Sequence, residues 1–185
     1  MSKLFNLIML ALLIAVCTGR AQAKDSTCMY PRDGILLAKH PNCLLRHGKR
    51  SLRVSPRQLP QLPFDGKYAT IFSEAYGWMY VNRDGVVVVD HVIYMDNGAD
   101  YIKHGFVRFT RNGKCGYASL GSDATITPKF DGCLPFSGSK ARVCTGCRVV
   151  TGGEYSWYKG GHSFCINPKG RHVSCEPNKS SKRTR

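Results

Sequence analysis

Apolar residues alternate with polar ones through the middle of the chain, between turns that are rich in glycine and asparagine. The β-branched run at residues 86–89 follows a turn at residues 82–85, and the run at residues 106–109 precedes a turn at residues 111–113. Such runs, bounded by such turns, are typical of short strands. After the N-terminal segment, no window carries an apolar stripe with the 3.6-residue period of a helix. The pattern therefore predicts an all-β fold of short antiparallel strands.

The first 23 residues have the layout of a secretory signal peptide. A charged start is followed by an apolar stretch over residues 7–16 and a small-x-small run at residues 21–23. Because this stretch is too short for a permanent span, we expect cleavage after Ala23 and a periplasmic or secreted mature chain. Lipoprotein processing at Cys17 is an alternative, which the bulky valine before it opposes. No transmembrane segment is expected after signal removal.

The mature chain has an even number of cysteines. Of the nine in the sequence, Cys17 leaves with the signal peptide, and an even remainder in an exported chain indicates four disulfides. Eight cysteines allow about 105 connectivities, so the pairing does not follow from the count. We expect nearest neighbours to pair: Cys28 with Cys43, Cys115 with Cys133, Cys144 with Cys147, and Cys165 with Cys175.

The strand-and-turn pattern repeats along the chain. Residues 78–94 align with residues 115–131 at a period of 37 residues, which places Tyr80 on Tyr117. One hairpin unit cannot bury its own apolar face, whereas neighbouring units together can. Shorter echoes join residues 32–37 with 83–88, residues 80–88 with 165–173, residues 64–66 with 130–132, and residues 105–109 with 139–143.

These repeats predict a single β domain over residues 24–176. Its units lie near residues 27–60, 62–114, 115–150 and 155–176, and a basic tail follows at residues 177–185. The tail has no apolar anchor, so we expect it to be mobile.

The unit that begins at Cys115 resembles a WG repeat, also called a KWG repeat. The pattern of that family is roughly Gly-Lys-Trp-Gly-Tyr, a glycine turn, Pro-x-Phe-Asp, and then Phe-Ser-x-Gly-x-Ala-x-Val. The resemblance extends over residues 62–143 and implies β-hairpin repeats stacked in a row, with little about activity. The matching positions are Gly113, Lys114, Gly116, Tyr117, Ile126, Pro128, Phe130, Asp131, Phe136, Ala141 and Val143.

Cys115 occupies the position where the resembled family places tryptophan and where the preceding unit has Trp78. Exchanging a large aromatic residue for a small thiol leaves a cavity unless something else holds the unit together. The expected bond to Cys133 in the same unit would supply that restraint.

Basic residues greatly exceed acidic ones. Removal of the signal peptide leaves 25 Lys and Arg against 12 Asp and Glu, a net charge of +13, with much of the excess in residues 39–57 and 169–185. Such charge either keeps the chain solvated or attracts an anionic lipid, wall polymer, nucleic acid or acidic protein. The candidate binding residues of the first stretch are Arg46, Lys49, Arg50, Arg53 and Arg57.

Cys144 and Cys147 have the spacing of a redox pair, in a glycine-rich insertion that lengthens the distance to the next unit. A redox pair normally lies at a helix start, which the flanking sequence does not predict, so a structural disulfide that closes a loop is favoured over thiol chemistry. Zinc is a third alternative, because His-x-x-Cys motifs at residues 162–165 and 172–175 could complete a tetrahedral site. An oxidising compartment argues against it, and we expect neither metal nor cofactor.

Two further clusters of residues are candidate functional sites. The best acid/base cluster has no accompanying nucleophile motif, so a polar loop is the favoured interpretation. It comprises His91, His104, Asp90, Asp96 and Asp100.

Aromatic residues interleaved with cations could stack on single-stranded nucleic acid or sugars, although a repeat fold places Trp78, Tyr80 and Phe106 in the core. That set comprises Tyr76, Trp78, Tyr80, Tyr94, Tyr101, Phe106 and Phe109 with Arg83, Lys103, Arg108 and Arg111.

Together these features predict a non-catalytic exported protein that works as a binding module or envelope scaffold. Its expected partner is a protein or an anionic envelope component, contacted through the basic stretch, the tail and the loops between repeats. One alternative is a periplasmic inhibitor or immunity-type protein that blocks an enzyme through a loop. Another is a thiol oxidoreductase that uses the Cys-x-x-Cys pair.

Overall fold

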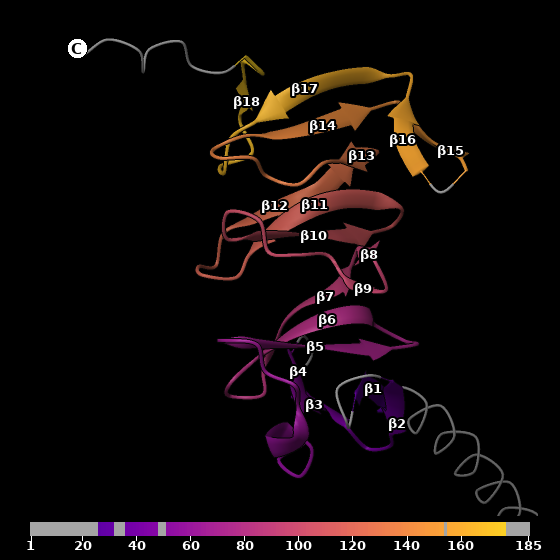
Figure 1. Ribbon diagram of the computed structural model, residues 1–185. Coiled ribbons are helices and arrows are strands. Elements are labelled where there is room, and N and C mark those ends of the chain that lie inside the picture. Colours follow the sequence, from indigo (N-terminus) through magenta and orange to yellow (C-terminus); the bar gives the residue numbers. More distant parts are fainter. Residues whose placement is uncertain (1–25, 32–35, 48–50, 154, 177–185) are drawn as a thin grey trace, which may run out of the picture. The chain divides into compact units, whose positions relative to one another are not determined.

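The computed structural model describes residues 26–31, 36–47, 51–153 and 155–176 (Figure 1). Within these residues the regular structure is β-strand apart from one 3-10 turn, which confirms the all-β fold class. The chain forms two compact units, and the boundary between them falls between His91 and Val92. The proposed signal peptide and basic tail lie outside the described residues.

The first unit is built around one antiparallel meander. Its strands run in the order β2, β1, β5, β6, β7, and β3 and β4 form a separate hairpin. Residues Ala69, Ile71 and Ser73 alternate inward along β5, as the period-two pattern predicts. The elements are β1 (Cys28–Pro31), β2 (Leu37–His40), β3 (Leu44–His47), β4 (Ser51–Val54), η1 (Leu59–Gln61), β5 (Tyr68–Ser73), β6 (Gly77–Asn82) and β7 (Val87–Val92).

The second unit contains the meander β10-β11-β12, a four-stranded sheet of order β13-β14-β17-β18, and two small hairpins, β8–β9 and β15–β16. Its core is formed by buried side chains of β11, β12, β14 and β17. The strands are β8 (Tyr94–Met95), β9 (Gly98–Ala99), β10 (Phe106–Arg111), β11 (Lys114–Ser119), β12 (Thr125–Phe130), β13 (Gly132–Cys133), β14 (Ala141–Thr145), β15 (Arg148–Gly152), β16 (Tyr155–Lys159), β17 (His162–Ile166) and β18 (His172–Val173).

The same tight turn precedes three strand pairs. In each turn two residues exchange a pair of backbone N–H to C=O hydrogen bonds, and the pairs β5–β6, β10–β11 and β14–β17 follow. This backbone repetition supports the internal repeats expected from the sequence. The residues that exchange these bonds are Asp65 with Tyr68, Lys103 with Phe106, and Ser137 with Lys140.

A second turn recurs after β6 and after β17. The Asn82 side-chain carbonyl accepts hydrogen bonds from the backbone N–H groups of Asp84 and Val86 at 3.1 and 2.9 Å. The Asn167 carbonyl accepts the corresponding bonds from Lys169 and Arg171, both at 3.0 Å. The sequence echo between residues 80–88 and 165–173 is therefore an echo in hydrogen bonding as well.

One part of the sequence alignment is wrong. Residues 64–66 were matched with residues 130–132, but the turn at Gly66 corresponds to the turn at Gly138, where the φ angles are 61° and 59°. Gly132 lies instead in β13, pressed against Cys144 and Tyr158, so that a Cβ there would approach the Cys144 Sγ to 2.5 Å. Gly132 is therefore a glycine required by close packing. The two segments share only the tripeptide Phe-Asp-Gly.

All four disulfides join the expected nearest neighbours: Cys28 with Cys43, Cys115 with Cys133, Cys144 with Cys147, and Cys165 with Cys175. The first two bonds lie inside the apolar cores of the first and second unit respectively. Cys115 is the second residue of β11, as Trp78 is of β6, so the two occupy equivalent strand positions.

Gly116, the residue after Cys115, is required by the approach of the neighbouring strand. The β11–β12 register shifts between Cys115 and Tyr117, and this bulge brings the β12 backbone against the glycine. A Cβ at this position would lie 2.3 Å from the Ile126 carbonyl oxygen and 2.7 Å from the Pro128 nitrogen.

We therefore expect Gly116→Ala to lower the free energy of unfolding by about 1–3 kcal/mol, because backbone atoms must move to admit the methyl group. Urea unfolding of the oxidised protein measures the change. Gly121→Ala is the matched control, since in the described structure a Cβ there meets no atom beyond its chain neighbours within 4 Å. Equal stability of the two variants would contradict the close approach.

Candidate functional site: an inserted hairpin and its groove

The β15–β16 hairpin is an insertion in the turn of a repeated strand pair. Strands β5 and β6 are joined by residues 74–76, and β10 and β11 by residues 112–113. Strands β14 and β17 pair in the same way up to Thr145 and His162, yet residues 146–161 intervene. These residues form the hairpin, in register from Arg148–Lys159 to Gly152–Tyr155.

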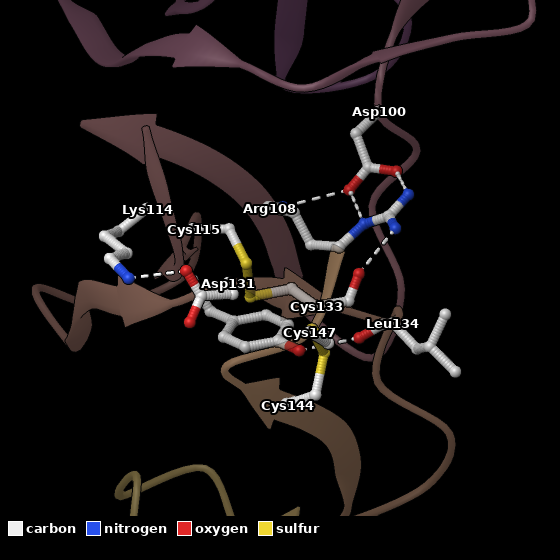
Figure 2. Close-up of a disulfide and its surroundings, with 10 residues drawn as sticks. Asp100, Arg108, Lys114, Cys115, Asp131, Cys133, Leu134, Cys144 and Cys147 are labelled. Atoms are coloured by element: carbon white, nitrogen blue, oxygen red, sulfur yellow. Dashed lines mark hydrogen bonds and ion pairs between the residues drawn. A yellow bond between two sulfur atoms is a disulfide. The ribbon is translucent and has the colours of Figure 1, made fainter. Parts of the chain in front are cut away.

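The base of the hairpin is closed covalently and by hydrogen bonds (Figure 2). The disulfide joins Cys144, buried in β14, to Cys147 just before β15. Between them, the Gly146 N–H donates to Asp131 Oδ2 at 2.8 Å, while the Lys114 ammonium donates to Asp131 Oδ1. This arrangement agrees with the loop-closing interpretation, and no helix starts at the pair in the described chain.

A groove of ≈ 610 Å³ lies along the hairpin within the second unit. Its lining comes from residues around β8, from residues 134–135 after β13, from β14 and from the hairpin. Large apolar side chains at its edge are exposed to solvent: Tyr94 by 61 %, Leu134 by 44 %, Val149 by 59 % and Trp157 by 49 %.

Arg108, which lines the groove, forms a buried ion pair with Asp100 (Figure 2). Arg108 Nε donates to Asp100 Oδ2 at 2.9 Å, a terminal nitrogen donates to Asp100 Oδ1, and the other donates to the Cys133 carbonyl at 2.9 Å. Burial acts to lower the pKa of Arg108, but the hydrogen bonds and charge of Asp100 outweigh it, so that the pKa is raised. Arg108 is therefore charged, and its charge is balanced inside the unit.

The rim residue Leu134 is held by its backbone. Its carbonyl accepts a hydrogen bond from the Tyr117 hydroxyl at 2.7 Å, and its N–H donates to the Arg142 carbonyl at 2.9 Å. Burial raises the pKa of Tyr117, so the phenol stays protonated and keeps donating. The apolar rim is thus fixed in place rather than left to a free loop.

The aromatic residues considered as a ligand platform are mostly core, as the repeat interpretation favours. Trp78 and Tyr80 are buried, and Phe106 stacks on Phe136 with ring centroids 4.6 Å apart. Of the aromatic members of that set only Tyr94 lines the groove, and Tyr101 is exposed. Sequence reasoning missed Leu134, Val149 and Trp157, although the glycine-bounded insertion around the tryptophan was a signal that could have found them.

The candidate basic residues lie in the first unit, and two of them are used within it. Arg46 donates to the Tyr76 hydroxyl at 2.7 Å and lies over that ring, and Arg53 donates to the Asp84 carbonyl at 2.8 Å. Arg57 is exposed. The other two members, Lys49 and Arg50, lie outside the described residues.

The members of the acid/base cluster have separate partners. His91 lies 3.6 Å from Asp90, Asp100 pairs with Arg108, and His104 Nε2 accepts a hydrogen bond from the Gly138 N–H at 2.9 Å. Asp96 has a positive φ of 43° in the turn between β8 and β9. The polar-loop interpretation thus fits Asp96 and His104, whereas Asp90 and His91 lie in β7 and Asp100 is buried.

The cysteines that the zinc alternative needs are all paired in disulfides, so they cannot serve as metal ligands. In the chain as described, no three residues of His, Cys, Asp or Glu are arranged to hold a metal ion. His162 and His172 both pack against the Phe164 ring, with centroids 5.6 and 5.2 Å away.

Comparison with known proteins gives no relative. No protein-family model, no curated protein and no solved structure matches this chain. Among the described residues, no helix is long and apolar enough to cross a membrane. The four disulfides indicate an oxidising environment.

The Asp131 carboxylate makes a pH-dependent contribution to stability. Its hydrogen bond from Lys114, followed by that from the Gly146 N–H, lowers its pKa in the folded state. A depressed folded pKa stabilises the protein above the unfolded pKa of about 3.9, and this contribution is lost as the pH falls through the folded value.

We expect Asp131→Asn to melt below the parent at pH 7, and the difference in Tm to shrink as the pH falls below about 4 and to vanish only below the lowered folded pKa of Asp131. Melting curves across this range, followed by circular dichroism, measure it. Asp123→Asn, in an exposed loop, is the control and should follow the parent throughout. A difference between Asp131→Asn and the parent that persisted unchanged in acid would rule out the charged interaction as its source.

Proposed function

We propose that this chain is an exported, non-catalytic binding protein of the WG-repeat type, in which repeated strand units form the scaffold and the inserted hairpin binds a protein partner. The observation that carries the proposal is the groove of ≈ 610 Å³ beside the hairpin, with four large apolar side chains exposed at its edge. Export rests on the N-terminal sequence together with the disulfides.

An insertion carried by a regular scaffold is a common place for recognition. Loops tolerate change that strands do not, and rigid strands hold them in position. Single exposed apolar residues need no explanation, but Leu134, Val149 and Trp157 share one groove, which favours an interaction site. Tryptophan, tyrosine and arginine are also the residues most enriched at the energetic centres of protein interfaces.

A protein partner fits this groove better than an anionic polymer does. Polyanions are bound mainly by arrays of cations, and the binding weakens steeply as salt rises. The groove wall is instead mostly apolar, with aliphatic and aromatic side chains, and Arg46 and Arg53 of the basic stretch already serve contacts within the first unit. An anionic envelope component is therefore the second candidate for the chain as a whole.

An inhibitor or immunity-type role is a more specific form of the same proposal. The disulfide at Cys144 and Cys147 closes the hairpin base, and a restrained loop loses less entropy when it enters an enzyme cleft. This role predicts a tight, salt-resistant complex with one enzyme. Thiol oxidoreductase activity is less favoured, because Cys144 is buried and lacks an adjoining helix in the described chain.

The test removes the hairpin and keeps the strand pair. Residues 146–161 are replaced by Asn-Gly, the sequence that joins β10 and β11 at residues 112–113, and Cys144→Thr removes the orphan thiol. Thr110 occupies the equivalent position in β10, so the replacement follows the protein's own repeat. We expect the variant to fold, because Thr145 and His162 already pair directly.

Crosslinking pull-downs from the envelope fraction, with washes of rising salt, then compare this variant with the parent. The parent should retain one identified protein through high salt, and the hairpin-replaced variant should lose it while its far-UV circular dichroism stays strand-like. Lys67→Gln, a surface change in the first unit, should retain it. Equal capture by the hairpin-replaced variant, or loss of the partner from the parent at moderate salt, would refute a hairpin-mediated protein complex.

A further inference from the structure

Arg142 occupies the same repeat position as Arg108 but has a different environment. Each arginine stands two residues after the residue that closes the tight turn, Phe106 for Arg108 and Lys140 for Arg142. Arg108 is buried and neutralised by Asp100, whereas Arg142 is exposed and lines the groove. Within the described part of the chain, no carboxylate forms a salt bridge with Arg142.

Two further cations, outside the groove lining, stand at the base of the hairpin. Arg148 and Lys159 are directly opposite each other across β15 and β16, and both are exposed. Like charges in this position destabilise a strand pair. Among the described residues neither forms an ion pair, and the neighbouring acid, Asp131, is taken by Lys114 and Gly146. A bound anion would relieve the repulsion.

We propose that the groove binds an extended acidic segment of another protein, with an apolar side chain against Leu134, Val149 and Trp157 and a carboxylate on Arg142. This inference rests on the proposed function and names the chemistry of the partner. The bound carboxylate takes toward Arg142 the role that Asp100 takes toward Arg108. The groove volume of ≈ 610 Å³ lies within the usual range of about 300–1,000 Å³ for binding sites.

The main chain of such a segment has a place to pair. Among the described strands, β15 and β16 pair only with each other, so each leaves one edge open. An extended peptide can add a strand to such an edge, with alternate side chains directed to one face. Main-chain pairing then supplies affinity, while the apolar rim and the cations select the sequence.

Other occupants agree less well with these features. A second copy of the chain without its signal peptide carries a net charge of +13, so its approach to the exposed Arg142 in the groove is opposed. An anionic polysaccharide would satisfy the cations but has no apolar side chain for the aliphatic wall formed by Leu134, Pro135 and Val149. A protein segment with both acidic and apolar side chains matches both Arg142 and the apolar wall of the groove.

A random 12-residue phage-display library tests the specificity directly. The library is panned on the immobilised parent protein after depletion on the hairpin-replaced variant. We expect the selected peptides to combine Asp or Glu with large apolar residues. A fluorescein-labelled peptide of the consensus sequence then reports the affinity by fluorescence anisotropy.

Two variants should weaken that peptide at least about tenfold: Trp157→Ser, which removes an apolar contact, and Arg142→Glu, which reverses the charge. Lys67→Glu makes the same charge change on the first unit and should bind like the parent. A peptide with lysine at its acidic positions should regain affinity for Arg142→Glu. Melting temperatures show whether each variant is folded, and the charge-swapped peptide distinguishes a specific contact from a damaged groove.

Peptides selected without acidic residues, or no enrichment over the hairpin-replaced variant, would overturn the acidic-segment assignment. Displacement of the peptide by polygalacturonate with equal effectiveness on the parent and on Trp157→Ser would assign the cations to a polysaccharide instead. A protein partner still captured in the pull-down under either result would leave the broader binding function standing.

Discussion

A disulfide inside each apolar core is the restraint on which the rest of this structure depends. Short strands bury little apolar area, and small cores of this kind rarely stabilise a fold without covalent help. Cys28–Cys43 and Cys115–Cys133 lie among the buried residues of the two units, so they fix strands that the cores alone would hold weakly. Cys115 stands at the strand position where β6 has Trp78, so that in β11 a covalent bond replaces the packing of a large ring.

Asp131 links this restraint to the hairpin. One carboxylate oxygen accepts from Lys114, the neighbour of Cys115 (Figure 2), and the other accepts from the Gly146 N–H, between Cys144 and Cys147. The core of the second unit and the base of the insertion are therefore coupled through a single side chain. The groove edge is similarly tied inward, since Tyr117 of the core donates to the Leu134 carbonyl.

The sequence predicted the features that depend on local chemistry. Alternation and β-branched runs gave the strand class, and the short separations between neighbouring cysteines favoured the pairing that the structure has. Features that depend on tertiary approach were missed. Gly132 resembled a turn glycine but is a packing glycine, and the exposure of Trp157 depends on how the hairpin leaves the sheet. Likewise, Arg108 and Arg142 stand at equivalent sequence positions, but Arg108 is buried against Asp100 and the Cys133 carbonyl whereas Arg142 is exposed.

The direct pairing of Thr145 with His162 has a consequence for how such a chain can change over time. Because β14 and β17 pair with each other up to the base of the insertion, their pairing does not depend on the length or sequence of the hairpin. Substitutions in the hairpin change recognition with a smaller cost in folding stability. Substitutions at its base change both recognition and stability. A protein arranged in this way can follow a changing partner, and the same position is a natural graft point for engineered hairpins of new specificity.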